Sequence, residues 1–360
     1  MRIAQIAPLY EDVPPATYGG TERVVAGLCD GLVAAGHDVT LFATATSTTT
    51  ARLEPAVHSP LRSRMGAAEL AEHGPRLHEQ MLDEVLLRAD EFDVIHSHVD
   101  LSLPYMSAVG SPYTPWLLTM HGRLDVAHAR IALSRARGAA LVSISDDQRR
   151  AVASLPLQWM ATVPNGLALG DYHRHPRDDG GYLAFLGRMS HEKRPDVAIE
   201  VARRTGWQLK IAAKVDPFDT EYFRHDIEPL LAGDHVEFLG ELGEAQKPGF
   251  FANASATLFP SDWPEPFGLV MIESLAAGTP VIALRRGSVP EILEHGVSGF
   301  ICDDPEDMVR AVDRIGEIDP ADCRRRARDF GVEQMADGYE RVYAELMARA
   351  SAGATDARSA

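Results

Sequence analysis

The chain has 360 residues, a length that fits two domains, each large enough to bury an apolar core. Its 52 acidic and 35 basic residues give a formal net charge of −17, which argues against a broad nucleic-acid surface or an extended contact with anionic lipid, because both need clustered basic residues. Three separated cysteines without paired spacing, and no apolar run near the roughly 18 residues of a membrane span, lead us to expect a cytoplasmic protein with reduced thiols.

Apolar runs of strand length alternate with stretches of helical period along the chain, as in parallel sheets that helices cover. The predicted fold class is therefore α/β. In the first half we expect strands at 2–7, 38–43, 92–98, 115–122 and 140–145 and helices at 20–36 and 78–90. The polar segment 44–60 is predicted to be a loop. Ser145, followed three residues later by Gln148, has the spacing of a helix-capping pair.

A stretch rich in Pro, Gly and Asp at 161–181 interrupts this pattern and indicates a domain junction. We expect domains at 1–166 and 167–335, followed by a helical segment at 336–360 whose tail, from residue 350, is small, polar and frayed. Strands of the second half are expected at 182–188, 207–213, 235–240, 256–260, 279–284 and 299–302. The second half therefore repeats the α/β pattern of the first.

The segment EPFGLVMIE, 265–273, places a glutamate at each end of a mostly apolar run. Glu265 precedes a proline, so it should lie on the loop after a strand, where open parallel sheets bind ligands. Glu273 lies inside a helix that is apolar on nearly every side, so its charge needs a partner. The helix start near Gly268 offers backbone N–H groups to a phosphate. We therefore expect a nucleotide sugar here; a solvated acid pair and a glycosidase pair are the alternatives.

Lysine is scarce in this chain: it occurs only at positions 193, 210, 214 and 247. In GRMSHEK, 187–193, Arg188 and Lys193 fall on a predicted strand-to-helix loop. A lysine at such a loop, in a chain that otherwise uses arginine, suggests a compact charge for a diphosphate. A solvated surface pair is the alternative interpretation.

Three motifs of the first half follow predicted strands. Gly19 and Gly20 suit close approach to a phosphate or sugar, or an ordinary turn, and they do not form the G-x-G-x-x-G dinucleotide motif. His121 ends a strand at the edge where a sugar contact would lie, although a lone histidine is more often structural. His96 and His98 have no nearby acid or third ligand, so we interpret them as loop residues and not as a metal site.

The first half also lacks an Asp-x-Asp pair after a predicted strand, the carboxylate site by which many diphosphate-handling enzymes bind a divalent ion. Arg188, Lys193 and the helix start would then neutralise the leaving group. We therefore expect no metal site and no cofactor beyond the substrate itself.

Together and in this order, these motifs resemble the retaining glycosyltransferases of family 4, the group 1 enzymes that are similar to glycogen synthase and sucrose synthase. The block FPSDWPEPFGLVMIESLAAGTPVIA, 259–283, is the most specific part, and VPNG at 163–166 and GSVPEILEHGVSGF at 287–300 extend the similarity over nearly the whole chain. The resemblance implies the GT-B fold, in which two Rossmann-like domains turn their parallel sheets to a central cleft. The first domain would bind the acceptor, the second the nucleotide sugar, and the final helix would cross back to the first.

The resemblance also assigns roles to residues. Arg188 and Lys193 would hold the diphosphate, Glu265 the donor-sugar hydroxyls and Glu273 the ribose. The remaining implied donor-binding positions are Pro266, Phe267, Gly268 and Leu269 around sugar and phosphates, Phe238 and Leu239 beside the base, Gly19 and Gly20 near the diphosphate, and His121 by the reacting sugar. The expected reaction moves a hexosyl group from a nucleotide-diphosphate sugar, UDP by family frequency, with retention of configuration and without metal.

The acceptor is not named by the sequence: a small molecule, a glycan and a glycolipid remain open. A lipid acceptor is less favoured, because the first half has no lysine and is net acidic. Two alternative functions are a nucleotide-sugar-binding protein without transfer activity and a related GT-B phosphorylase or epimerase.

Overall fold

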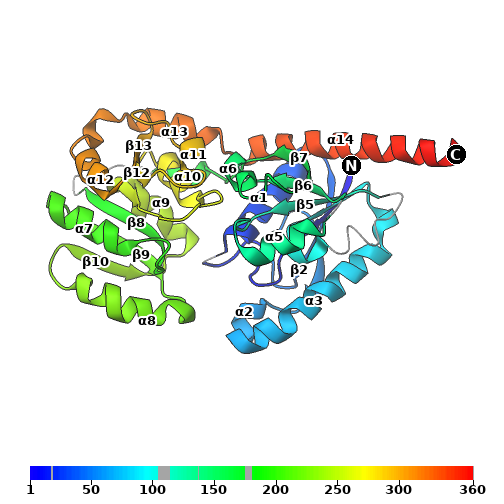
Figure 1. Ribbon diagram of the computed structural model, residues 1–360, viewed down its shortest axis with the longest axis horizontal. Helices are drawn as coiled ribbons and strands as arrows, with labels where there is room; N and C mark the ends of the chain where they lie inside the picture. Colours follow the sequence, from blue (N-terminus) through cyan, green and yellow to red (C-terminus); the bar gives the residue numbers. More distant parts are fainter. Residues whose placement is uncertain (18, 104–113, 137, 175–180, 360) are drawn as a thin grey trace. The chain divides into compact units, whose positions relative to one another are not determined.

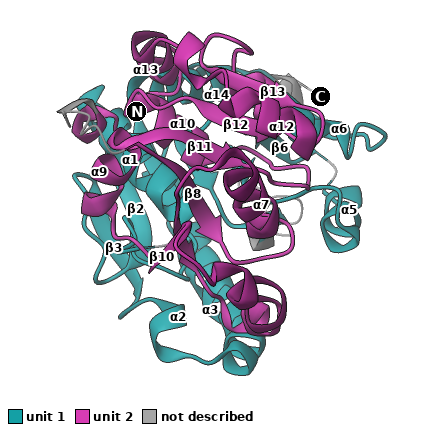
Figure 2. Cartoon of the chain, turned by 90° about the vertical axis from the view of Figure 1, so that its left-hand side faces the viewer, with its two compact units in different colours: residues 1–167, 332–360 teal, residues 168–331 magenta. Residues whose placement is uncertain are grey.

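The chain forms two compact units in the computed structural model, which describes residues 1–17, 19–103, 114–136, 138–174 and 181–359 (Figure 1). Unit 1 contains Met1–Leu167 and Val332–Ala360, and unit 2 contains Ala168–Gly331 (Figure 2). Each unit has its own parallel sheet and its own core, so the α/β prediction with two parallel sheets is confirmed.

Unit 1 is built on a seven-stranded sheet in the order β3-β2-β1-β4-β5-β6-β7. The strands are β1 (Arg2–Ile6), β2 (Asp38–Thr44), β3 (Arg52–Val57), β4 (Val94–Ser97), β5 (Trp116–Met120), β6 (Ala140–Ser143) and β7 (Gln158–Thr162). Every neighbouring pair is parallel. The central strands are buried on both faces, which explains why the sequence shows them as continuous apolar runs.

The helices of unit 1 connect and cover these strands. They are α1 (Gly20–Ala34), α2 (Leu61–Arg64), α3 (Ala67–Leu87), α5 (Ala127–Ser134), α6 (Asp146–Arg150) and α14 (Val332–Ser359), with the short turns η1 (Ala89–Glu91) and η2 (Asp100–Ser102). The terminal helix α14 packs on α1 (Figure 1). Two glycines of α1 allow this close approach, because a Cβ on Gly31 would lie 2.7 Å from Val332 Cγ1 and one on Gly27 would lie 3.1 Å from Val332 Cγ2.

Three predictions for unit 1 were wrong. Residues 52–57 form the edge strand β3 and not a loop; the strand tolerates Pro55 because an edge strand needs ladder bonds on one side only. Strand β7, at the other edge, was not predicted, since all five of its residues are only half-buried. Helix α3 begins at Ala67, eleven residues before the predicted start, and its first two turns are largely exposed, so they carry no apolar stripe.

Unit 2 is built on a six-stranded parallel sheet in the order β10-β9-β8-β11-β12-β13. Its strands are β8 (Tyr182–Arg188), β9 (Leu209–Lys214), β10 (Val236–Gly240), β11 (Ala254–Phe259), β12 (Val281–Leu284) and β13 (Gly299–Cys302). The predicted strands agree with these within two residues at either end.

The connections of unit 2 are helices and short turns. They are η3 (Gly170–Arg174), α7 (Pro195–Thr205), η4 (Pro217–Asp219), α8 (Thr220–Tyr222), η5 (Phe223–Ile227), η6 (Glu228–Leu231), η7 (Glu244–Gln246), α9 (Lys247–Ala252), α10 (Leu269–Ala276), α11 (Val289–Ile292), α12 (Pro305–Val312), η8 (Ile315–Glu317) and α13 (Pro320–Arg328). Part of the predicted junction, residues 175–180, lies outside the described residues.

The end of the chain differs from the sequence prediction. Helix α14 continues to Ser359, through residues predicted to be frayed. Several of these are alanines, which have the highest intrinsic helix propensity. Among the described residues, no helix has the combined length and apolarity of a membrane span.

Candidate functional site

Two loops of unit 2 meet at the carboxyl ends of neighbouring strands. Strands β8 and β11 pair in parallel near the centre of the sheet, so the loops after them begin at the same edge. The loop after β8 carries Lys193, and the loop after β11 carries Glu265. The backbone N–H of Asp262 donates to the Glu192 carbonyl at 2.9 Å, which joins the two loops directly.

Lys193 and Glu265 form an ion pair across these loops. The Lys193 Nζ donates to Glu265 Oε2, and Trp263 Nε1 donates to the same oxygen at 2.8 Å. The ammonium also lies 5.0 Å from the Trp263 ring centroid and 5.5 Å from that of Phe259. Only 17% of the Lys193 side chain and 11% of the Glu265 side chain are exposed. The loop thus fixes one cation and one carboxylate in contact at the sheet edge.

Helix α10 begins four residues after Glu265, at Leu269. The sequence predicts a start at Phe267 or Gly268; Gly268 is instead the N-cap, with φ +88°, and it has no side chain to cap the first turn. A Cβ at Gly268 would meet Met271 Cε at 2.6 Å and Glu265 Cγ at 3.5 Å. This position therefore requires glycine for its left-handed backbone and for its packing.

A third loop, after β12, supports the backbone around Glu265. A Cβ at Gly287 would lie 2.3 Å from both the nitrogen and the oxygen of Glu265, so the two backbones are in close contact. Ser288 N–H donates to the Glu265 carbonyl at 3.0 Å, and Ser288 Oγ donates to the Phe267 carbonyl at 2.6 Å. No contact between this segment and Glu265 was predicted from the sequence.

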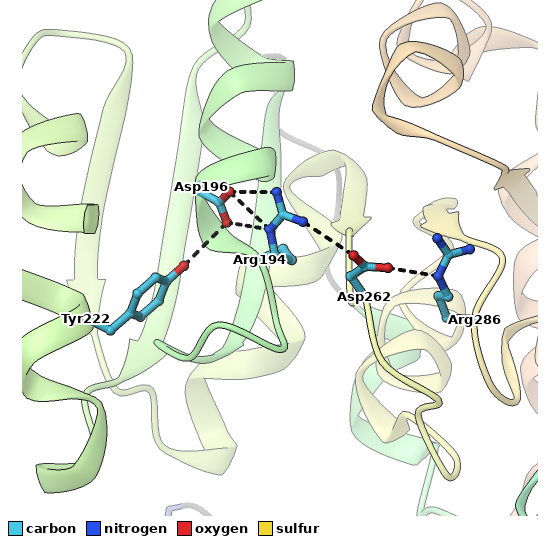
Figure 3. Close-up of polar contacts among 5 residues, drawn as sticks. All are labelled: Arg194, Asp196, Tyr222, Asp262 and Arg286. Carbon is cyan, nitrogen blue, oxygen red and sulfur yellow. Dashed lines mark hydrogen bonds and ion pairs between the residues drawn. The ribbon is translucent and has the colours of Figure 1, made fainter. Parts of the chain in front are cut away.

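A chain of charged residues connects all three loops (Figure 3). Asp262 accepts hydrogen bonds from Arg286 Nε at 2.8 Å and Arg194 Nη1 at 3.5 Å. Arg194 also binds Asp196 through its Nε and Nη2 at 2.9–3.1 Å, and Tyr222 donates to Asp196 at 3.4 Å. Arg194 follows Lys193 and adopts a left-handed backbone conformation, with φ +52°. Residues other than glycine rarely adopt this conformation. These contacts hold a strained residue beside the site lysine.

Glu273 lies inside α10 and only 1% of its side chain is exposed. Tyr172 Oη donates to Glu273 Oε1 at 2.8 Å, and Lys247 Nζ lies 3.6 Å from the same oxygen. Lys247 also pairs with Glu244. A partner for this buried carboxylate was predicted, and the protein provides a tyrosine and a lysine, neither of which was predicted.

Arg188 ends β8 and lies at the same loop as Lys193. Its guanidinium contacts Glu192 at 3.1 Å and Asp219 at 3.8 Å. Burial raises the pKa of the Asp219 carboxyl. Within the described residues, the buried Nε of Arg188 has no hydrogen-bond partner, so this side chain retains a donor for a further group.

Phe238 and Leu239 lie on β10, the edge strand of unit 2. They are 36% and 37% exposed, which is unusual for large apolar side chains in this chain. The Phe238 ring lies beside Phe223, with 5.6 Å between centroids. The edge therefore presents a small apolar surface that can stack on a flat ligand.

In unit 1, the glycine pair lies at the start of α1, with Gly19 as the N-cap. A Cβ at Gly19 would lie 2.7 Å from Pro15 Cβ and 3.2 Å from Glu22 Oε2, whereas Gly20 is the first residue of the helix. Glu22 is buried in the first turn, and burial raises its pKa to about 7. Close packing against Pro15 is thus one reason why position 19 is a glycine.

His121 follows β5 and is held by a second histidine. His98 Nδ1 and His121 Nε2 lie 2.8 Å apart, and burial lowers the pKa of His121 to about 4. The interpretation of His96 and His98 as loop residues is wrong for His96, which is part of β4, and both are buried because β4 is a central strand. Among the described residues, no three His, Cys, Asp or Glu side chains group as metal ligands.

Gln148 holds the backbone on both sides of His121. Ser145 Oγ accepts from the Gln148 N–H at 3.2 Å, as the capping prediction requires. The Gln148 side-chain amide donates to the carbonyls of Met120 at 2.9 Å and Gly122 at 2.7 Å. The cap of α6 thereby positions the segment that carries the histidine.

Comparison with known proteins identifies the family to which this chain belongs. A model for glycosyl transferases group 1 matches residues 173–330, and a model for glycosyltransferase family 4 matches residues 18–170. The chain belongs to the family 4, group 1 glycosyltransferases. The fold, the family and the enzymatic class inferred from the sequence motifs are therefore confirmed.

Relatives of this glycosyltransferase cover nearly its full length. The glycogen synthase of Mycobacterium tuberculosis is 28% identical over 95% of this chain and 94% of its own. The phosphatidyl-myo-inositol mannosyltransferase of Mycolicibacterium smegmatis is 28% identical over 89% of this chain and 86% of its own. The structure of Anabaena HepE in complex with UDP-glucose is similar in fold, with TM-score 0.73, 18% identity, and coverage of 97% of this chain and all of that one.

The glycosyltransferase brings some predicted site residues together and leaves others separate. Lys193, Glu265 and Gly268 lie in contact around the start of α10. Arg188 shares their loop and contacts Glu192, whereas Glu273 binds Tyr172 and Lys247 further along the helix. Trp263, Tyr172 and Lys247 were missed. The scarcity of lysine was the one signal available for Lys247, but a role was predicted from it only for Lys193.

Proposed function

We propose that this glycosyltransferase moves a hexosyl group from a nucleotide-diphosphate sugar, with retention of configuration and without a divalent metal. Unit 2 would bind the donor, and unit 1 would bind the acceptor. The observation that carries the proposal is the contact of Lys193 with Glu265 beside the N-terminus of α10.

This contact provides both charges that the donor needs. A diphosphate at the helix start would meet the partial positive charge of the backbone N–H groups and the ammonium of Lys193. Once Lys193 turns to the phosphate, Glu265 is released to accept hydrogen bonds from sugar hydroxyls, while Trp263 continues to orient its carboxylate. One ion pair would thus be exchanged for two ligand contacts, which avoids leaving a buried charge alone.

The other site residues extend this binding mode. Arg188 retains an Nε donor that would reach the diphosphate and stabilise its charge as the glycosidic bond breaks. Two cations at one leaving group support the proposal that no metal is required. Glu273 would bind the ribose hydroxyls from a carboxylate that Tyr172 and Lys247 keep in place.

The remaining predicted residues would contact other parts of the same donor. Phe238 and Leu239, exposed on the edge strand, would pack on the nucleobase. Pro266, Phe267 and Leu269 would contribute backbone around the sugar and phosphates. Gly19, Gly20 and His121 are proposed to contact the diphosphate and the reacting sugar.

We propose that the nucleotide of the donor is UDP. The structure of HepE in complex with UDP-glucose supports this choice by analogy. The acceptor is a small molecule, a glycan or a glycolipid. The two relatives named above indicate the range, because one is a glycogen synthase and the other a phosphatidyl-myo-inositol mannosyltransferase. The acidic unit 1 makes a lipid acceptor the less favoured choice.

The test is donor turnover over a panel of UDP-, GDP- and ADP-sugars, with and without EDTA. We expect one nucleotide series to raise the melting temperature of the protein and to be consumed equally in chelator. The product's anomeric configuration, read by NMR, should match that of the donor. Loss of turnover in EDTA, or an inverted product, would contradict the proposed chemistry, and a product formed without any acceptor would indicate an epimerase.

A further inference from the structure

A buried chain of hydrogen bonds in unit 1 runs from the terminal helix α14 to His121. Its members, in spatial order, are Tyr339, Thr119, His96, Tyr343, Gln5, His98 and His121. Consecutive members lie 2.7–3.0 Å apart. All but His121 are at most 3% exposed, so no bulk water competes for their polar atoms.

The direction of each bond is determined from Gln5 outward. Gln5 Nε2 donates to Tyr343 Oη, so the amide oxygen Oε1 faces His98 and can only accept. His98 therefore carries its proton on Nε2, which donates to that oxygen. Burial holds the pKa of His98 well below its ordinary value, so the ring is neutral and its Nδ1 is an acceptor.

His121 then has one tautomer available to it. Because His98 Nδ1 accepts, His121 Nε2 must carry a proton and donate across the 2.8 Å contact. The ring of His121 is also neutral at pH 7, so its Nδ1 carries no proton. The opposite branch is consistent: Tyr343 Oη donates to His96 Nδ1 at 2.7 Å, and His96 Nε2 donates to Thr119 at 2.8 Å.

We propose that Tyr343 and Gln5 act as positioning residues that set the tautomer of His121, so that its Nδ1 is a fixed hydrogen-bond acceptor. This step rests on the proposed function: the Nδ1 atom would accept a hydrogen bond from a hydroxyl of the transferred hexosyl group. A residue near the end of the chain thereby selects sugars that present a hydroxyl donor at that position.

The first experiment is NMR of the full chain labelled with ¹⁵N-histidine, which distinguishes protonated from unprotonated ring nitrogens. We expect His121 to be protonated on Nε2 only. His78 is an internal reference for the opposite tautomer, because its Nδ1 faces the Gly74 carbonyl and its Nε2 accepts from the Leu9 N–H. A His121 proton on Nδ1 in the wild-type spectrum would overturn the inference, whether or not any variant folds.

The second experiment compares Tyr343→Phe with Tyr339→Phe. Both changes remove one hydroxyl from a buried tyrosine of the same helix, but Tyr339 lies beyond Thr119, outside the segment that links Gln5 to His121. Tyr343→Phe should free the Gln5 amide to turn and give a mixture of His121 tautomers. Tyr339→Phe should leave the His121 signals unchanged. Unchanged tautomers in Tyr343→Phe would overturn the proposal.

Turnover separates this inference from the proposed function. Only the tautomer with an unprotonated Nδ1 can accept the hydroxyl, so kcat/KM for the donor in Tyr343→Phe should fall to the fraction of that tautomer seen by NMR, about twofold for an even mixture, and it should stay unchanged in Tyr339→Phe. Mixed tautomers with full turnover would overturn the sugar contact of His121 while the tautomer assignment stands. Reduced turnover with an unchanged tautomer would overturn the positioning role.

Discussion

Lys193 and Trp263 bind the same oxygen of Glu265, one as an ammonium and the other through its indole N–H. The ammonium also lies over the indole ring, so the tryptophan fixes the carboxylate and the cation together. In the proposed function a diphosphate sugar would separate these two charges, and the role of each partner can be tested by substitution.

Lys193→Ala should lower kcat/KM for the donor by about 10²- to 10³-fold, the usual effect of losing one charge-stabilising donor. Lys210→Ala is the matched control, because Lys210 is also paired with a glutamate, Glu237 at 3.2 Å, and also lies over an aromatic ring, Tyr182. Steady-state kinetics measures both variants. Equal rates for Lys193→Ala and wild type would remove Lys193 from the site.

Gly287→Ala should disturb the site through Glu265, since the added Cβ would lie 2.3 Å from the Glu265 backbone. Gly296→Ala separates this clash from backbone strain: Gly296 also has a positive φ, +78°, but a Cβ there would meet nothing within 4 Å. We expect Gly296→Ala to lose about 1 kcal/mol of unfolding free energy and keep its activity. Gly287→Ala should lose more and raise the KM for the donor, as urea unfolding and kinetics will report.

Arg194 should reveal its backbone strain when alanine and glycine replacements are compared. Both variants lose the contacts with Asp196 and Asp262, but only glycine accepts φ +52° without strain. We therefore expect Arg194→Gly to be more stable than Arg194→Ala by about 1 kcal/mol in urea unfolding. Arg203→Ala, which removes an exposed pair with Glu200, should cost little. Equal stability of the two Arg194 variants would argue against strain at this residue.

The buried histidines predict how stability depends on pH. Burial lowers the pKa of His96, His98 and His121, so the unfolded chain binds protons first, near the ordinary pKa of about 6.5. The contribution of these histidines to the free energy of unfolding is fully present above that pH. It is lost as the pH falls toward the pKa of the folded protein, which is about 4 for His121. The loss is up to about 1.4 kcal/mol per pH unit for each imidazole.

Urea unfolding between pH 7 and pH 5 measures this slope. His98→Gln should reduce the slope of unfolding free energy against pH by an amount that corresponds to about one bound proton. His225→Gln is the comparison variant, because it replaces a histidine whose side chain is 76% exposed in the folded protein. A slope that is the same in both variants and wild type would contradict the assignment.

The central strands of both sheets were predictable because they are buried on both faces and therefore appear as apolar runs. The edge strands β3 and β7 were not, since half-buried residues such as Gln158 and Glu54 carry no such signal. At the candidate site, local motifs selected Glu265 and Lys193, which the structure brings into contact. The contact of Lys247 with Glu273 was missed, because it depends on how α9 packs beside α10, which no local pattern contains.

Unit 1 is formed by the first 167 residues together with the residues after 331. This arrangement has a consequence for biosynthesis. On the ribosome, unit 2 is translated in full before Tyr343 is made, so His96 and Gln5 acquire their shared hydroxyl partner only after unit 2 has been synthesised. The nascent chain therefore has a complete unit 2 while unit 1 still lacks a helix. A stalled or truncated chain that ends before residue 332 would retain the Lys193–Glu265 pair yet have an unsatisfied polar centre in its first sheet.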